Sequence, residues 1–308
     1  MRLERKPRIL RLPANSSDSV RKSDTARDNP WLHRFSLLVA AATLFLILAG
    51  GLVTSHEAGL AVPDWPLSYG QVMPPMVGNV FWEHSHRMIA GTVGMLTLIL
   101  TLWVQWRETR RGVRWLAWIA LGAVILQALL GGLTVLLLLP APVSIFHACL
   151  AQTFFCLLIA LAYFLGRTPP PEMDDAAARQ GLRRLAVITV GFVYLQLILG
   201  ATVRHTGYAV AVHIVGAFLV LLHILLLVLK ISHVCSAASR LPRLGAALGI
   251  MVLVQFFLGI GAFVFTRMLE RGYAPRTEEI ILTAAHQTLG AMILGAAFFI
   301  ALRAYHHE

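Results

Sequence analysis

Residues 195–220 read LQLILGATVRHTGYAVAVHIVGAFLV and contain the pattern that decides the fold. Two apolar runs are separated by a short connection that carries an arginine and a histidine. The first run holds Gln196 and Gly200 in the spacing Q-x-x-x-G, and the second run begins near His213. Apolar runs of about 20 residues can cross a bilayer as helices. The stretch therefore predicts two membrane helices joined by a short loop.

The rest of the chain continues this pattern. Of its 308 residues, 57% are hydrophobic and 13% charged, and the mean hydropathy is +0.72. This composition favours a polytopic membrane protein over a soluble one. We predict an all-α polytopic membrane protein with eight transmembrane helices, because too many runs reach spanning length for buried soluble helices. The expected runs are 34–55, 84–105, 115–139, 143–165, 183–203, 209–231, 243–266 and 280–303.

Lysine and arginine indicate the orientation. The net charge is +11, which often suggests a nucleic-acid partner, but here the basic residues lie between apolar runs. With the N-terminus inside, the inner segments and their flanks hold 21 of the 26 Lys and Arg residues, and the outer segments hold five. The positive-inside rule therefore predicts an N-in, C-in topology and no nucleic-acid partner. No disulfide is expected, because Cys149 and Cys156 lie inside an apolar run and Cys235 lies beside an inner loop.

The chain also repeats internally. Three odd-numbered runs carry Q-x-x-x-G, whereas the first has Leu46 before Gly50. We expect two four-helix bundles related as a parallel repeat with its axis along the membrane normal. The glutamine–glycine pairs are Gln127 with Gly131, Gln196 with Gly200 and Gln255 with Gly259. The expected divisions are a disordered basic tail 1–33, an N-terminal bundle 34–167 with an outer loop 55–82, an inner linker 168–182, a C-terminal bundle 183–303 and a tail 304–308.

One histidine lies near the start of each even-numbered run, about a turn below the outer surface: His86, His147, His213 and His286. A single intramembrane histidine often caps a helix or bonds to a neighbouring backbone group. Four at equivalent positions favour ligands of a metal, because imidazole ligates haem iron and four-helix bundles build cofactor sites between facing helices. We expect one pair in each half. Zinc is the alternative, although it prefers three or four ligands in one cluster.

The stretch EHSHR at residues 83–87 places a carboxylate beside the first of these histidines. Glu83 and His86 are three residues apart and share a face of a helix, whereas His84 points elsewhere. The second half has no equivalent carboxylate. This asymmetry predicts proton chemistry in the first half. The alternative is a first-turn residue stabilised by the helix dipole.

Two further features lie at the outer surface. Arg87 can pair with a propionate or a lipid phosphate, and Arg204 can serve the second site or snorkel to the interface. The outer loop 55–82 is rich in glycine, proline and aromatic residues, which suits a lid over the carboxylate side. For Trp65 and Trp82 the alternative is interfacial anchoring.

The chain resembles the haem A synthase family over about residues 35–303. The motifs are EHSHRMIAG, GLAVPDWPLSYGQVMPP, VRHTG, FHACLAQ, AVHIVGA and AAHQTLGA. The resemblance implies an oxidoreductase of the cell inner (cytoplasmic) membrane, with its histidine sites near the outer face. The family oxidises the C8 methyl of haem O to a formyl, which yields haem A for terminal oxidases. Many members carry a cysteine pair in the first outer loop, which this chain lacks, so the route of the electrons is left open.

The family's pattern also implies a ligand set and partners. The substrate is haem O and the fixed cofactor is haem b, in a setting of membrane lipid. Implied partners are haem O synthase, terminal oxidase assembly factors, an electron acceptor and a second copy of the chain. The implied catalytic residues are Glu83, His86 and His147. The expected cofactor-binding residues are His213 and His286 in the haem b half, together with Arg87 and Arg204. All four histidines are expected to be axial ligands of haem iron.

Two other functions compete with this interpretation. A di-haem b electron-transfer cytochrome with bis-histidine ligation would hold two equivalent permanent haems and would not need Glu83. A transporter would favour interrupted helices and polar groups near the midplane of the membrane. The asymmetry between the halves favours the enzyme.

Overall fold

The computed structural model describes residues 29–166, 176–236, 240–270 and 272–305. These residues form eight long α-helices and one short π-helical turn, η1. The elements are α2 (Pro30–Ser55), α3 (Asn79–Arg107), α4 (Arg111–Leu136), α5 (Ala141–Leu165), α6 (Ala176–Thr206), α7 (Val210–Val234), α8 (Leu241–Phe263), η1 (Val264–Met268) and α9 (Thr277–Tyr305).

All eight helices are long and apolar enough to cross a membrane. The shortest has 23 residues, which at about 1.5 Å per residue exceeds the roughly 30 Å of a bilayer's hydrocarbon core. The predicted fold class, an all-α polytopic protein with eight transmembrane helices, is therefore confirmed. The parallel repeat and the N-in, C-in orientation stay predictions.

Local capping moves several helix boundaries outward from those expected. Asn29 accepts a hydrogen bond from the Leu32 amide at 3.1 Å, and a proline occupies the first turn, so α2 begins at Pro30. The last residues of the expected tail 1–33 are therefore helical, while residues 1–28 lie outside the described part. Similarly, residues 176–182 of the expected linker belong to α6, and residues 167–175 lie outside the description.

The outer loop is shorter than expected. Gly78 has a positive φ of 55° and precedes the first residue of α3, so the loop covers residues 56–78 rather than 55–82. Glycine adopts this left-handed backbone without a Cβ clash. Glu83 and His86 consequently lie in the first turns of α3, where the helix fixes their positions.

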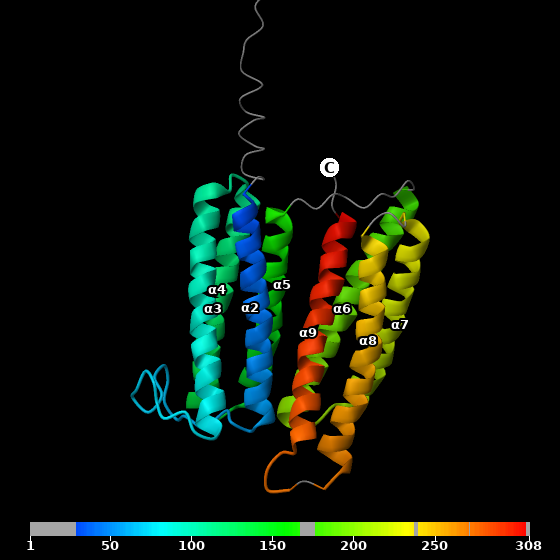
Figure 1. The fold of residues 1–308 in the computed structure, drawn as a ribbon. Helices are drawn as coiled ribbons and strands as arrows, with labels where there is room; N and C mark the ends of the chain where they lie inside the picture. Colours follow the sequence, from blue (N-terminus) through cyan, green and yellow to red (C-terminus); the bar gives the residue numbers. More distant parts are fainter. Residues whose placement is uncertain (1–28, 167–175, 237–239, 271, 306–308) are drawn as a thin grey trace, which may run out of the picture.

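The helices form two adjacent groups (Figure 1). The blue-to-green helices α2–α5 stand beside α6–α9, and the described chain starts and ends at the same end of the bundle. The groups meet where α2 packs on α9 and α5 packs on α6 and α9. A hydroxyl pair crosses one of these contacts, because Thr153 Oγ1 of α5 lies 2.8 Å from Tyr194 Oη of α6.

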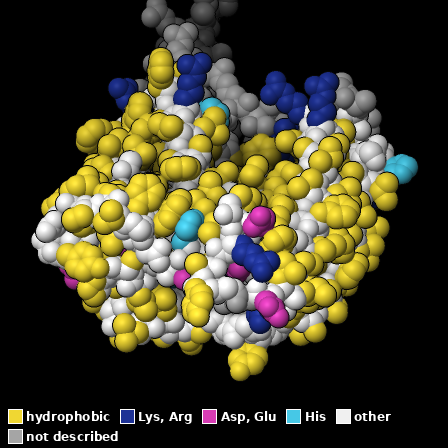
Figure 2. Space-filling model, turned by 60° about the horizontal axis from the view of Figure 1, so that its bottom comes forward, with side chains coloured by type: hydrophobic (Ala, Val, Ile, Leu, Met, Phe, Trp, Pro, Cys, Tyr) yellow, Lys and Arg dark blue, Asp and Glu magenta, His cyan; other side chains and the backbone are white. Residues whose placement is uncertain are grey.

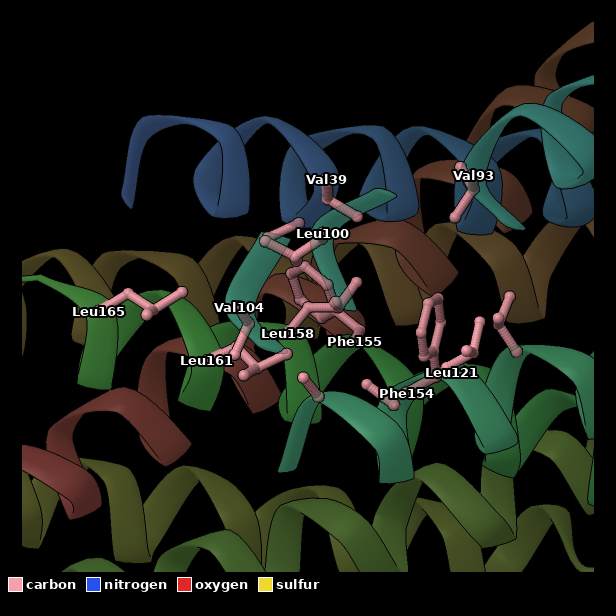
Figure 3. Close-up of a cluster of buried hydrophobic side chains, with 14 of the residues drawn as sticks. Val39, Val93, Leu100, Val104, Leu121, Phe154, Phe155, Leu158, Leu161 and Leu165 are labelled. Carbon is pink, nitrogen blue, oxygen red and sulfur yellow. The ribbon is translucent and has the colours of Figure 1, made fainter. Parts of the chain in front are cut away.

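Each group has its own buried apolar cluster. The first contains Leu100 of α3 and Leu158 of α5, which lie close together in Figure 3. In the second, Leu227 and Leu248 are fully buried. The surface of the molecule is also apolar around its sides. Figure 2 shows hydrophobic side chains there, with Lys and Arg along the upper edge of the view. This surface suits a bilayer, where lipid tails solvate apolar side chains.

Candidate functional site

The four predicted histidines occupy equivalent seats. Each lies near the start of its helix, and its imidazole edge rests on a glycine of the preceding helix. A Cβ added to any of these glycines would come within 3.3 Å of the histidine Cε1, tighter than most real Cβ contacts, so the ring would have to shift to admit a larger residue. The pairs, with the distance from the added Cβ to Cε1, are Gly50 with His86 (3.1 Å), Gly131 with His147 (3.3 Å), Gly200 with His213 (3.1 Å) and Gly259 with His286 (2.9 Å).

Three of the four histidines have a second attachment. A glutamine one turn before the glycine donates its amide N–H to the backbone carbonyl of the histidine. The bonds are Gln127 to His147 (2.9 Å), Gln196 to His213 (2.8 Å) and Gln255 to His286 (3.0 Å). The Q-x-x-x-G spacing therefore contacts each histidine at two points, an arrangement called here a two-point seat. The glutamine amide binds the backbone carbonyl of the histidine, and the glycine leaves space for its imidazole ring. The sequence showed the spacing, but not this role.

The histidines come together in the two expected pairs. The ring centres of His213 and His286 are 6.3 Å apart, with an angle of 76° between the planes. Two imidazoles on one metal, with bonds of about 2 Å, place their ring centres roughly 6 Å apart. In the first half, the structure brings His86 and His147 close enough to interact electrostatically. In the described residues, no three His, Cys, Asp or Glu side chains gather as ligands of one metal ion.

These surroundings fit an axially ligated haem. The Nδ1 atoms of His86, His147 and His286 are buried without a hydrogen-bond partner. Buried polar atoms are nearly always satisfied, so these three unpartnered ring nitrogens indicate a group that belongs there; Nδ1 of His213 instead lies 3.0 Å from Nε2 of Gln196. A bis-histidine haem needs only two imidazoles and a flat space between helices.

Glu83 is buried and fully engaged with the outer loop. It is only 3% exposed. Its Oε2 accepts a 2.8 Å hydrogen bond from the Val62 backbone N–H, and its Oε1 accepts one from Arg87, one turn further along α3. Two donors therefore hold the carboxylate at a fixed place. The structure turns Glu83 toward the loop and His86 toward Gly50, although the two share the start of the helix.

Arg87 binds the same loop. Its Nη1 donates to the carbonyls of Asp64 and Leu67, both at 2.7 Å, and its Nη2 donates to Glu83 and more weakly to the Val62 carbonyl at 3.3 Å. These contacts use all four terminal N–H groups of the guanidinium. The predicted contact of Arg87 with a propionate or a lipid phosphate remains untested.

Further contacts seat the loop on the bundle. Ser68 lies 2.8 Å from Nδ1 of His84, which is buried rather than lipid-facing. A Cβ on Gly132 of α4 would lie 2.7 Å from the Trp65 ring, so this tryptophan rests directly on the helix. Gly132 follows the glycine that seats His147. Trp65 therefore packs on α4 beside that seat, a contact that its sequence pattern did not distinguish from interfacial anchoring.

Asp64 shapes the tip of the loop. Its carboxylate accepts hydrogen bonds from the backbone N–H groups of Gly70 and Tyr69, at 2.8 and 2.6 Å. These bonds, first that from Gly70 and then that from Tyr69, hold the pKa of Asp64 below its ordinary value. The turn is therefore formed with a charged carboxylate at neutral pH.

Arg204 lies at a junction between the halves. Its Nη2 donates to Ser55 Oγ at the end of α2, at 2.8 Å. Ser55 in turn lies 2.8 Å from Thr283 Oγ1 of α9. Three helices from two halves therefore meet through polar side chains at the loop end of the protein. The expected contact of Arg204 with a cofactor stays a prediction.

The described residues form eight helices long and apolar enough to cross a membrane, with one pair of histidines in each half. A family model described as COX15-CtaA, cytochrome oxidase assembly protein, matches residues 76–213. The haem A synthase of Bacillus licheniformis is 27% identical over 187 residues, which are 59% of this chain and 62% of the relative. That of Staphylococcus haemolyticus is 31% identical over 194 residues, 60% of this chain and 61% of the relative.

The chain is therefore similar to haem A synthases over part of its length, and the family model matches a stretch that includes His86, His147 and His213. The haem A synthase of Halalkalibacterium halodurans agrees, at 28% identity over 58% of this chain and 60% of the relative. The matched part spans about 60% of the length of these curated relatives. The motif EHSHRMIAG lies inside the matched family region.

Proposed function

We propose that the protein is a haem A synthase that oxidises the C8 methyl of haem O to a formyl, for haem A of terminal oxidases. The observation that carries this proposal is an asymmetry between similar halves. All four histidines sit on a glycine seat, but only the first half adds a buried carboxylate and a loop clamped over its mouth. The two halves hold similar histidine pairs, but the groups around the pairs differ. This difference suits a haem that reacts in the first half and a haem that stays fixed in the second.

In this proposal the second half holds the cofactor. His213 and His286 are the axial ligands of haem b, supported by their ring separation of 6.3 Å and by a glutamine behind each. Haem b bound there supplies one-electron redox chemistry. Its two ligands hold it in place and leave no position open for a substrate.

The first half holds the substrate haem O between His86 and His147. Glu83 contributes a fixed carboxylate, since the Val62 N–H and Arg87 hold it in place in a buried site. A preorganised carboxylate of this kind stabilises positive charge that develops on the substrate, or accepts a proton as the carbon is oxidised. The clamped loop excludes water from the mouth of the site.

The membrane setting completes the proposal. The sites face the outer side of the cell inner (cytoplasmic) membrane, with both termini inside. Haem O synthase would supply the substrate, oxidase assembly factors would take the product, and an electron acceptor would remove the electrons. The loop 56–78 has no cysteine, so a thiol couple in this loop takes no part.

The direct test is conversion in a membrane that makes haem O but no haem A. The protein is expressed there, the haems are extracted, and chromatography is used to look for haem A or a hydroxylated form of haem O. We expect haem A. Membranes that contain the folded protein and haem O, but neither of these products, would refute the activity. Two bound haem b groups without conversion would instead identify an electron-transfer cytochrome.

A further inference from the structure

The seat of His86 differs from the other three. Glutamine donates to the backbone carbonyl of His147, His213 and His286, but the equivalent position one turn before Gly50 is Leu46. Leucine has no donor. Within the described part of the chain, no hydrogen bond joins a side chain to the carbonyl of His86, whose ring lies against Gly50.

The missing bond has a physical consequence for a ligand. Hydrogen bonds around a ligating histidine fix its orientation and strengthen its hold on the metal. The glutamine ties the backbone of the histidine to the preceding helix. If the bond between metal and imidazole opened, the ring would then stay close to the metal and would rebind quickly. A histidine without that anchor would turn its ring away from the metal more readily.

We propose that His86 is the exchangeable axial ligand of the substrate haem, and that Gln127, Gln196 and Gln255 are positioning residues that keep the other three ligands in place. This inference rests on the proposed function. A substrate site has to admit haem O and release haem A, whereas a cofactor site does not. The arrangement matches this difference: both second-half ligands have the two-point seat, and one first-half ligand lacks it.

The test is the substitution Leu46→Gln, which supplies the missing donor at the position where the other three seats have one. The full-length protein is loaded with haem A in the first half and haem b in the second. The formyl group shifts the absorption of haem A away from that of haem b, so each haem is followed separately. Carbon monoxide is then added to the reduced protein, and its binding rate to haem A measures how fast an axial histidine leaves.

We expect Leu46→Gln to slow carbon monoxide binding at haem A by about 3- to 20-fold, the range that one interhelical hydrogen bond in a membrane corresponds to. Leu46→Met is the matched control, because it keeps an apolar side chain without a donor, and it should bind at the wild-type rate. Transfer of haem A to apomyoglobin should slow in the same order. The haem b spectrum reports that each variant is folded.

The second half provides the reverse experiment. Gln255→Leu removes the anchor of His286 and should open haem b to carbon monoxide, which we expect the wild-type protein to exclude. A wild-type rate in Leu46→Gln, with both haems bound, would overturn the assignment of His86 and leave the proposed function standing. A wild-type protein that binds no haem in its first half would overturn both.

Discussion

Arg87 donates to the Glu83 carboxylate one helical turn before it, and its other terminal N–H groups donate to carbonyls of the outer loop at 2.7 to 3.3 Å. One guanidinium thus connects the start of α3, the buried carboxylate and the loop. Lysine cannot replace it, because a single ammonium lacks the planar fork that reaches several acceptors at once.

Arg87→Lys should release the outer loop. Charge-assisted hydrogen bonds contribute about 1.5–3 kcal/mol each, so losing one or two should raise the cleavage rate of residues 56–78 by about tenfold or more. Limited proteolysis of the protein in membranes measures this rate. Arg267→Lys is the control, because Arg267 donates to the Gly207 carbonyl in the other half. Equal cleavage of wild type and Arg87→Lys would show that the loop is held by other contacts.

Glu83→Gln should abolish conversion of haem O while the low-spin haem b spectrum is retained. The amide keeps the size and one acceptor but loses the charge that the proposed chemistry uses. Haem extraction measures conversion, and reduced-minus-oxidised spectra measure haem b. Full activity in this variant would remove Glu83 from the mechanism.

Glu108→Gln is the matched control for that experiment. Glu108 is also buried and paired with an arginine, Arg110, but it lies at the opposite end of α3. Burial alone would raise the pKa of Glu108, yet the hydrogen bonds from Arg110 hold it below its ordinary value. Its substitution should lower the stability of the protein and leave the specific activity of the folded fraction unchanged.

Gly259→Ala should displace His286 and weaken haem b. The added Cβ would lie 2.9 Å from the ring, closer than real Cβ contacts allow, and overpacking of this kind costs about 1–3 kcal/mol. We expect loss or broadening of the low-spin haem b absorption. Gly249→Ala in the same helix is the control, since its Cβ would make ordinary contact with Val228 at 3.5 Å. Equal spectra for both variants would contradict the glycine seat.

Loop docking should depend on pH through Asp64. Hydrogen bonds from Gly70 and Tyr69 place its folded pKa below the ordinary 3.8. A carboxyl whose folded pKa is lowered stabilises above its unfolded pKa and loses that contribution as the pH falls through the folded one. Protection of the loop should therefore be constant from pH 7 to about 4 and decline below it.

Asp64→Asn provides the comparison. The amide does not titrate, so the variant should be less protected at neutral pH and should approach the wild type at acid pH. Glu83 also holds the loop through the Val62 N–H and is present in both proteins, so only the difference between them reports Asp64. A difference that does not change with pH would rule out this carboxylate as the origin. Hydrogen exchange of the loop amides measures it.

The sequence predicted the membrane fold well, because a spanning helix requires little more than length and apolar composition. It misplaced helix ends where local chemistry decides, as at Asn29, whose side chain caps α2, and at Gly78, whose positive φ starts α3. These bonds and angles depend on the conformation of single residues, which hydropathy does not report.

For the candidate site, the sequence located the histidines but not their surroundings. The Q-x-x-x-G spacing was visible, yet the bond from Gln196 to the His213 carbonyl joins two helices and cannot be read along one. Likewise, helical spacing paired Glu83 with His86, whereas the folded loop supplies the Val62 N–H and turns the carboxylate toward itself. Contacts made by an irregular loop have no periodic signal.

The junction of Ser55, Arg204 and Thr283 has a consequence for electron flow. Together with the hydroxyl pair of Thr153 and Tyr194, it ties the two halves at separate points along their boundary. If the halves separated, these polar side chains would lose their partners and face lipid, which costs free energy. The two halves should therefore stay in contact. In the proposed function, electrons would tunnel between the two histidine pairs, and the distance between the pairs would then be constant. Since tunnelling slows steeply with distance, the protein would exchange electrons between its two sites at one steady rate rather than waiting for a domain motion.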